Sequence, residues 1–317
     1  MPLKLGTNGI ALPLSKALLG TDLVYEMKKP GRFITVGQSG KSCYSTDGIN
    51  WTEMSGLTSA AYSLRSIAFG NGKIVIVGEG NHYYSLDGET WIKITGLSSS
   101  TFYGVCYGNG RFIAVGIKGK SYYSTDGLTW TTMSGLSTSY QYNAVAYGNG
   151  RFVCVGNNGY TYYSTNGTSW TKMSGISSGT SYHMYGVTYG NGRFVAVGIK
   201  GKAYYSTNGT SWTSMSGLNT GYSYNAVAYG NDRFVCVGEG AGRVKNAYYS
   251  TDGINWVEMT GIGSSGFTIM SVTYGNDRFV CVGTSGKSYY STDGTSWTEM
   301  TGLDTDYNYY GVAYGEV

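Results

Sequence analysis

The sequence predicts an all-β chain that folds as a seven-bladed β-propeller of four-stranded antiparallel blades. Three observations lead to this prediction: a segment that recurs along nearly the whole chain, four short β-type runs inside each copy, and two chain ends truncated in complementary ways. Recurrence with such a period is typical of a propeller or a solenoid, and the other two observations decide between them.

Seven tryptophans mark the copies of the repeat. Each follows a turn of the form Ser-x-Asp/Asn-Gly, and consecutive tryptophans are 39 to 44 residues apart. They are Trp51, Trp91, Trp130, Trp170, Trp212, Trp256 and Trp297. Seven copies predict seven structural units.

Each copy contains four runs typical of short β-strands, which in the third copy read YGVCYG, RFIAVG, SYYS and WTTM. Asn-Gly in residues 108–110 and Asp-Gly in residues 125–127 supply the positive φ angles that tight hairpins need. The four strands are therefore expected to be antiparallel and to form one blade. The second strand, residues 112–115, is apolar on both faces, as expected of a strand packed between two blades.

The two ends of the chain complement each other. The first copy begins at its second strand, Arg32 to Gly37, and the chain stops after a lone first strand in YYGVAYGEV. We expect the strand Gly311 to Tyr314 to join the first copy and close the ring, which leaves no exposed sheet edge. A solenoid would need caps instead. The predicted organisation is an N-terminal appendage over residues 1–29 and a propeller over residues 30–317.

Charge and composition argue against several classes of function. The net charge of +4 is small and forms no basic stripe, so we expect no nucleic-acid partner. No run of about 18 apolar residues occurs, so we expect no membrane insertion. The first 20 residues lack the continuous apolar core of a secretory signal peptide.

The five cysteines indicate thiols rather than a disulfide framework, because their number is odd. Cys154, Cys236 and Cys281 occupy the repeat position that holds Ala114 and Ala196 in other copies. A position that accepts alanine or cysteine suits a small apolar group in a packed core. Inert buried thiols agree with folding in a reducing cytoplasm.

The Ser-x-Asp-Gly-x-x-Trp element resembles the Asp-box turn of sialidase-type, BNR-like propellers, and it is present in all seven copies. It departs from that pattern because Asp and Gly are adjacent, one residue shorter than usual. We expect the Asp to cap local N–H groups while Trp packs between blades. Asn166 and Asn208 replace Asp in two copies, which argues against calcium binding by these carboxylates. We expect no metal and no cofactor.

The sequence offers no catalytic residues, and we expect a protein without enzymatic activity. Six arginines recur at one repeat position and so cannot converge on one substrate; their stems are expected to cover blade edges. They are Arg32, Arg111, Arg151, Arg193, Arg233 and Arg278. The non-repeated acids Glu79, Glu239, Asp304 and Asp306 form no recognisable pair of the kind that glycoside cleavage needs. His82 and His183 are expected to be ordinary surface residues.

The linkers between copies and the loops between second and third strands vary, and both sets are expected on the same face of the disc. This face defines the candidate ligand-binding residues: Tyr140, Tyr142, Tyr182, His183, Tyr222, Tyr224, Tyr307 and Tyr309. Tyr mixed with Ser, Asn and Gly is typical of adaptable recognition surfaces. The alternative is that these tyrosines only pack over the linkers.

The N-terminal segment LSKALLGTDLVYE, residues 14–26, does not fit the repeat. It is similar to a short segment common in bacteriophage tail proteins. The resemblance implies a virion-attached protein, made in the bacterial cytoplasm, whose residues 1–29 connect it to other virion proteins. The alternative is a strand that packs on the propeller.

These observations favour a non-enzymatic binding module that recognises a cell-surface carbohydrate or a surface protein. In the first hypothesis, a phage tail propeller binds cell-surface glycan through its tyrosine-rich loop face, with weak repeated sites that gain from multivalency. The second is a structural or protein–protein interaction propeller. The third, for which no catalytic pair is visible, is a glycoside-cleaving enzyme.

Overall fold

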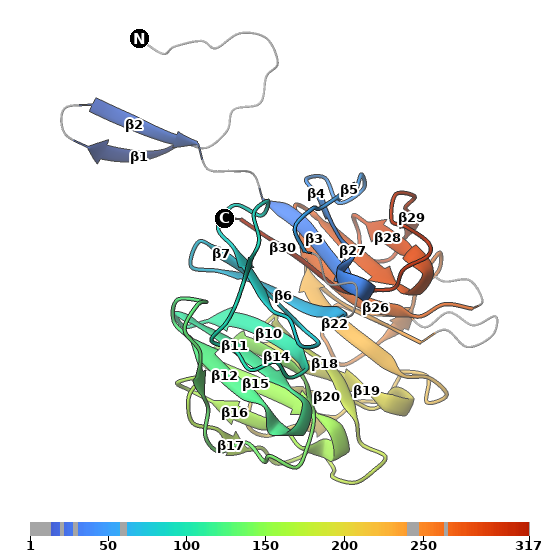
Figure 1. Ribbon diagram of the computed structural model, residues 1–317. Coiled ribbons are helices and arrows are strands. Elements are labelled where there is room, and N and C mark those ends of the chain that lie inside the picture. The colour runs from blue at the N-terminus through green and yellow to red at the C-terminus, as the bar shows by residue number, and fades with distance from the viewer. Residues whose placement is uncertain are drawn as a thin grey trace.

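Seven four-stranded antiparallel sheets follow one another around a ring, which confirms the predicted propeller (Figure 1). The computed structural model describes residues 31–57, 62–239, 247–262 and 266–316, together with the strands at 14–19 and 22–27. The described residues contain no α-helix, only strands, turns and five short 3-10 segments, η1 to η5.

Each blade contributes one inner strand next to the central axis. The inner strands of blades 1 to 7 are β30 (Tyr309–Gly315), β6 (Leu64–Gly70), β10 (Phe102–Gly108), β14 (Tyr142–Gly148), β18 (Met184–Gly190), β22 (Tyr224–Gly230) and β26 (Ile269–Gly275). The second strands are β3 (Arg32–Gly37), β7 (Lys73–Gly78), β11 (Arg111–Gly116), β15 (Arg151–Gly156), β19 (Arg193–Gly198), β23 (Arg233–Gly238) and β27 (Arg278–Gly283).

The outer half of each blade is shorter. The third strands are β4 (Ser42–Ser45), β8 (Tyr83–Ser85), β12 (Ser121–Ser124), β16 (Tyr162–Ser164), β20 (Ala203–Ser206), β24 (Ala247–Ser250) and β28 (Ser288–Ser291). The fourth strands have two residues each: β5 (Thr52–Glu53), β9 (Ile92–Lys93), β13 (Thr131–Thr132), β17 (Thr171–Lys172), β21 (Thr213–Ser214), β25 (Val257–Glu258) and β29 (Thr298–Glu299).

Blade 1 is assembled from both ends of the chain. Its strand order is β30-β3-β4-β5, and the register places Val312 opposite Thr35 and Gly315 opposite Arg32. The red strand β30 lies beside the blue strand β3 in Figure 1. The expected pairing of residues 311–314 with the first copy is therefore confirmed, and the strand extends further, from Tyr309 to Gly315.

The second strands form the core between blades. In β11, the side chains of residues 112–115 are all fully buried, so both faces of the strand are covered by neighbouring blades. Cys154, Cys236 and Cys281 are also fully buried, and all five cysteines are free thiols. Burial raises the pKa of the Cys43 thiol to about 11, which keeps this group protonated and unreactive at neutral pH.

The Asp-containing turns are held by side-chain caps, as expected. Asp126 Oδ1 accepts the backbone N–H groups of Leu128 and Thr129 at 2.8 Å and the hydroxyl of Ser124 at 2.9 Å. Asn166 Oδ1 accepts the equivalent backbone bonds at 2.9 and 3.0 Å. Burial raises the pKa of Asp126, but these N–H donors outweigh it and lower the pKa to about 2. The Asp or Asn side chain of each of these two turns therefore caps its backbone directly.

Side chains at the rim link consecutive blades. Trp170 Nε1 donates to Met133 Sδ of the preceding blade at 3.1 Å. Arg151 Nη1 donates to the Asn208 carbonyl in the turn of the following blade at 2.9 Å. Trp212 and Trp297 make the same bond to Met173 and Met259, and Arg233 bonds the Asp293 carbonyl in the same way, so these side chains join consecutive blades.

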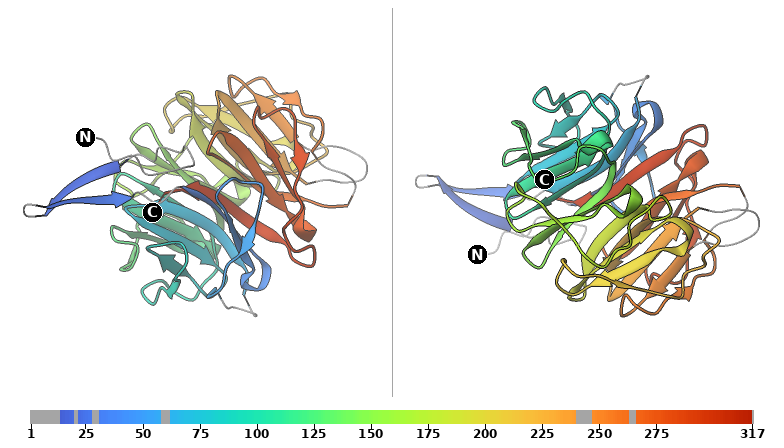
Figure 2. Two further views of the ribbon diagram at one scale, coloured as in Figure 1. Left: turned by 90° about the horizontal axis from the view of Figure 1, so that it is seen from above. Right: turned by 90° about the horizontal axis from the view of Figure 1, so that it is seen from below.

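The propeller has two distinct faces. One, the hairpin face, carries the turns between first and second strands; the other, the linker face, carries the linkers that precede the inner strands. The described propeller begins at Gly31 and ends after Gly315 on the hairpin face, because Arg32 pairs with Gly315 there. Strands β1 (Leu14–Leu19) and β2 (Asp22–Met27) pair with each other in an antiparallel two-stranded sheet (Figure 2).

Candidate functional site

The linkers and the loops between second and third strands lie on one face, as predicted. In blades 3, 4, 5 and 7, a backbone hydrogen bond joins this loop to the linker that leads into the next blade. The pairs are Gly119 N to Tyr140 O at 2.6 Å, Gly159 N to Tyr182 O at 2.5 Å, Gly201 N to Tyr222 O at 2.8 Å and Gly286 N to Tyr307 O at 2.9 Å. The linker face is thus a continuous surface in these blades.

Three of the eight candidate residues do not contribute to that surface. The side chains of Tyr142, Tyr224 and Tyr309 are fully buried. Each is the first residue of an inner strand, and this position points into the core between blades, where Tyr142 meets Tyr162 edge to face at 5.7 Å. The expectation that these three tyrosines are exposed is therefore wrong.

The other candidates lie on the linker face and are half-buried. One side of several rings is already covered. Tyr140 stacks on Tyr160 with ring centroids 3.4 Å apart, and the ammonium groups of Lys202 and Lys41 lie 4.8 and 4.9 Å from the rings of Tyr182 and Tyr307. Packing over the linkers therefore accounts for much of the tyrosine content, and whether Tyr140, Tyr182, His183, Tyr222 and Tyr307 bind a ligand remains a prediction.

A ring of seven side chains at the mouth of the central channel was missed in the sequence. Each belongs to the second residue of an inner strand, and the register shifts at that residue in every blade. From blade 1 to blade 7 the ring residues are Tyr310, Arg65, Tyr103, Asn143, Tyr185, Asn225 and Met270. A β-bulge re-aims the side chain of its extra residue, and here all seven line one cavity of about 220 Å³.

The bulges depend on glycine at the end of each second strand. A Cβ atom on Gly116 would lie 2.1 Å from the carbonyl oxygen of Thr101, just before the inner strand. The residue that follows each ring residue in the sequence is small because the inner strand of the next blade lies close to it. A Cβ atom on Gly104, for example, would lie 3.0 Å from the Cα of Ala144 in the next blade. The chain therefore brings the inner strands close together and leaves the ring side chains at the mouth.

Arg65 is the only charged member of the ring. Its guanidinium lies 4.1 Å from the ring centroid of Tyr310 and 6.0 Å from that of Tyr103. Its Nε donates to Glu79 Oε1 at 3.1 Å, and its Nη2 also contacts this carboxylate. Planar contact with aromatic rings and a carboxylate fixes the orientation of the arginine.

The two asparagines of the ring are also held in place. Asn143 Nδ2 donates to the Met184 carbonyl at 2.8 Å, and Asn225 Nδ2 donates to the Ile269 carbonyl at 2.9 Å. Burial, with a smaller effect of Glu239, raises the pKa of Tyr185, so its hydroxyl stays protonated at neutral pH. The site therefore offers neutral hydroxyl and amide groups around one arginine.

The described residues contain no cluster of three or more side chains that could hold a metal ion. None of their helices is long and apolar enough to span a membrane.

The expectation of a surface position is wrong for His82, whose side chain is buried. Its Nδ1 accepts the Gly78 N–H at 3.3 Å while Nε2 contacts the Ser98 carbonyl at 3.0 Å, and burial lowers its pKa to about 4.

No protein-family model and no curated protein sequence matches this chain. Solved structures do match. YCF48 from Cyanidioschyzon merolae superposes with a TM-score of 0.57 at 20% identity, over 75% of this chain and 84% of that one. YCF48 bound to D1 peptide gives a TM-score of 0.58 at 17% identity, over 86% of this chain and 84% of that one. The computationally designed protein Ika8 gives a TM-score of 0.59 at 13% identity, over 92% of this chain and 87% of that one. At these identities the likeness shows the propeller fold.

Proposed function

We propose that this protein is a non-enzymatic recognition propeller that binds a polypeptide partner through its linker face. The observation that carries this proposal is the ring at the channel mouth, where seven bulges aim side chains of differing chemistry at one cavity. This position is shared by all seven blades but holds four different residue types, Tyr, Arg, Asn and Met, and such variation favours a role in recognition over one in folding.

The chemistry of the ring suits a protein partner. Tyr and Arg are the residues that most often contribute strongly to protein–protein binding, and Met is also enriched at such interfaces. Arg65, Tyr103 and Tyr310 are already oriented by mutual contact, which lowers the entropy cost of binding. The structure of YCF48 with a peptide supports the idea that a propeller of this shape accommodates a polypeptide.

Cell-surface carbohydrate is the second candidate ligand. Tyr103, Tyr185 and Asn225 combine aromatic rings with hydroxyl and amide groups, which suits the mixed apolar and hydroxylated surface of a sugar. The covered rings of Tyr140, Tyr182 and Tyr307 weaken this candidate, because a sugar would have to stack on their remaining sides. It therefore ranks below a polypeptide.

Residues 14–26 favour attachment to a bacteriophage tail, with synthesis in the bacterial cytoplasm. They include all of β1 and all but the last residue of β2, and the described propeller begins on the hairpin face. A connector on that side would leave the linker face free to meet a partner. Immunogold labelling of virions with antibody to the chain tests this placement, and unlabelled tails would overturn it.

Selection from a displayed random-peptide library on the immobilised full chain tests the proposed function. We expect enriched peptides, and we expect Arg65→Ala with Tyr310→Ala to weaken them by about 30-fold or more. Lys73→Ala on the hairpin face is the matched control and should leave binding unchanged. Absence of enriched peptides, or equal binding by the double variant, would overturn the proposal. A glycan array with the same variants tests the second candidate.

A further inference from the structure

Blades 3, 4 and 5 are strongly basic, although the whole chain carries a net charge of only +4. Residues 90–231, which include all three blades, contain nine lysines and arginines, and Asp126 is their one acidic residue. Residues 31–89 and 232–317 together contain nine lysines and arginines but fifteen acidic residues. The small net charge therefore conceals a propeller with one basic half and one acidic half.

Five lysines of the basic half, here called the lysine arc, lie on the linker face or at its edge: Lys118, Lys120, Lys172, Lys200 and Lys202. Four belong to the loops between second and third strands of blades 3 and 5, and Lys172 ends the fourth strand of blade 4. The ammonium groups of Lys172 and Lys202 lie 4.6 and 4.8 Å from the ring centroids of Tyr160 and Tyr182. Contact with a ring orients an ammonium group without neutralising its charge.

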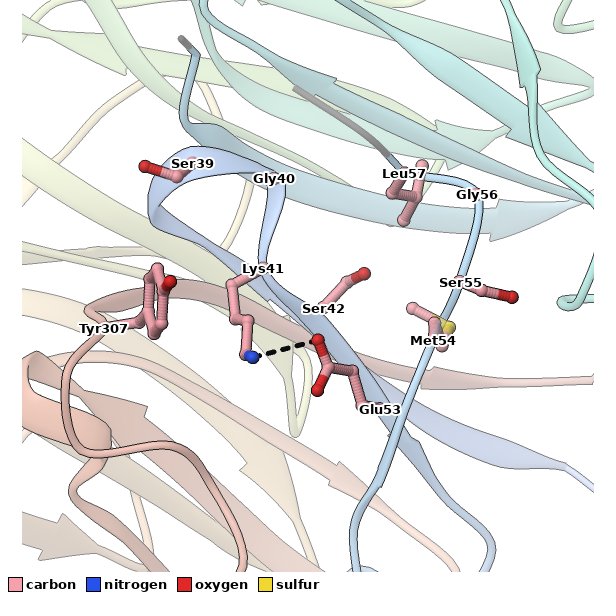
Figure 3. Close-up of a pocket in the computed structure, with 10 residues that line it drawn as sticks. All are labelled: Ser39, Gly40, Lys41, Ser42, Glu53, Met54, Ser55, Gly56, Leu57 and Tyr307. Atoms are coloured by element: carbon pink, nitrogen blue, oxygen red, sulfur yellow. Dashed lines mark ion pairs between the residues drawn. The ribbon is translucent and has the colours of Figure 1, made fainter. Parts of the chain in front are cut away.

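Lysines at the equivalent loop position in the acidic half are paired with carboxylates. In blade 1, Lys41 Nζ lies 2.9 Å from Glu53 Oε1 (Figure 3), and in blade 7, Lys287 pairs with Glu299. The described residues of blades 3 to 5 place no carboxylate on the linker face, because Asp126 lies in a turn on the hairpin face. The charge of the lysine arc is therefore not balanced by its own blades.

The division of charge recurs at separate positions of the repeat. The second residue of the fourth strand is acidic in blades 1, 6 and 7 and never acidic in blades 2 to 5, where it is Lys93, Thr132, Lys172 or Ser214. In the turn before that strand, Asn166 and Asn208 replace aspartate only in blades 4 and 5. They make the same backbone bonds as aspartate, so folding does not account for the lost charge.

A third position adds lysine rather than removing an acid. The middle residue of the loop between second and third strands has a left-handed backbone, with φ of 49° at Lys118 and Lys200 and 57° at Asn158. Asparagine adopts this conformation more readily than lysine, so the turn itself gives no reason for lysine. Three positions that lose acids or gain lysine on the same blades indicate a role in binding an anion.

Lys200 and Lys202 also line one hollow in blade 5. Its volume is about 240 Å³, and Ser214, Ser216 and Thr220 are among the other lining residues. A carboxylate accepts hydrogen bonds only, whereas ammonium and hydroxyl groups donate them. The hollow therefore suits one acidic side chain.

We propose that the lysine arc docks an acidic stretch of the polypeptide partner, with one carboxylate in the hollow of blade 5. The inference rests on the proposed function for the polypeptide nature of the partner. Carboxylates fit better than the phosphates of a nucleic acid, because the arc contains none of the planar arginine forks that favour bidentate phosphate binding. Arg151 of the same blades instead donates to the Asn208 carbonyl in a turn.

Fluorescence anisotropy of a labelled oligoglutamate peptide of about ten residues, titrated with the full chain, tests the arc. We expect binding that weakens at least about tenfold when NaCl is raised from about 50 to about 500 mM, because salt screens exposed charges. An oligoglutamine peptide of the same length should not bind. Lys172→Gln, Lys200→Gln and Lys202→Gln should each weaken oligoglutamate about threefold, and the triple variant about 20-fold or more.

Lys287→Gln is the matched control. It removes the same charge from the same face, but this lysine is already paired with Glu299, so binding should change by less than about twofold. Equal melting temperatures verify that the variants are folded. Equal oligoglutamate binding by the triple variant, or equal binding of the glutamate and glutamine peptides, would overturn the inference.

Two competing occupants are tested with the same variants. Tighter binding of an oligothymidylate of equal length through these lysines would overturn the inference in favour of a phosphate site. Sedimentation that shows a dimer at low salt, abolished by the triple variant, would overturn it in favour of a second copy whose acidic half covers the arc.

The peptide-library selection separates this inference from the proposed function. If enriched peptides depend on Arg65 but are neither acidic nor sensitive to the triple lysine variant, the polypeptide-binding function stands and the inference fails. If oligoglutamate binds through the arc while no enriched peptide depends on Arg65, the arc stands and the proposed role of the ring at the channel mouth fails.

Discussion

Thr35 and Gly311 lie 276 residues apart in the sequence, and the Thr35 hydroxyl donates a hydrogen bond of 3.0 Å to the Gly311 carbonyl. Thr35 is fully buried on the second strand of blade 1, and Gly311 lies on the last strand of the chain. The bond joins the two strands that close the ring. The stability of every blade is therefore linked to the presence of β30.

Deletion of residues 309–317 should open the ring. The deletion removes buried side chains, among them Tyr309 and Val312, and exposes the edges of β3 and its neighbours. Losses of about 2–5 kcal/mol for each large buried side chain predict a fall in melting temperature of more than about 10 °C. Circular dichroism measures it. Deletion of residues 316–317 is the control, and an unchanged melting curve for the longer deletion would refute the role of β30.

The propeller could be predicted because its determinants are local and repeated. The turn at Asp126, the apolar residues 112–115 and the missing first strand before Arg32 are all readable without long-range information. Seven copies also supply their own comparison, so Asn166 in place of Asp showed that the turn needs an acceptor rather than a charge. The structure confirms this with the bonds to Asn166 Oδ1.

The binding face could be predicted only in part, because side-chain direction at the start of an inner strand depends on a bulge. Simple alternation does not reveal that Tyr142 points into the core while Asn143 lines the channel. The available signal was the variation of the second residue among copies, from Arg65 to Met270. His82 was misjudged because its backbone partners, Gly78 and the distant Ser98, are not visible in a sequence.

Stability should fall in mildly acidic solution because of His82. Its folded-state pKa of about 4 lies below the unfolded value of about 6.5, so the unfolded chain binds more protons below pH 6.5. Stability is then unaffected above about pH 7 and declines from pH 6.5 to 4, by on the order of 3 kcal/mol in total. Urea unfolding at several pH values in this range measures how the free energy of unfolding depends on pH. His82→Gln should abolish this pH dependence, and an equal pH dependence in that variant would refute its assignment to His82.

The turn at Asp126 should tolerate an amide but not a methyl group. Asp126→Ala leaves the N–H groups of Leu128 and Thr129 without their acceptor and should cost about 1–2 kcal/mol. Asp126→Asn should cost less than about 0.5 kcal/mol, because Asn166 makes the same bonds in blade 4. Denaturant unfolding distinguishes them. Chelation with EDTA should leave the melting temperature unchanged; a decrease would point to a bound cation.

The bulge at the start of β14 makes two adjacent residues behave in opposite ways. Tyr142 is fully buried, so Tyr142→Ala should cost about 3–5 kcal/mol, as for other large core side chains. Asn143→Ala loses half-buried hydrogen bonds with Gln141, Asn157 and the Met184 carbonyl and should cost about 1–2 kcal/mol, less than Tyr142→Ala. In the peptide selection, Asn143→Ala should alter which peptides are enriched, because this side chain lines the channel mouth. If instead Tyr142→Ala changed the selected peptides while the melting temperature stayed constant, Tyr142 would have to reach the linker face, and the assignment of the ring at the bulges would be wrong.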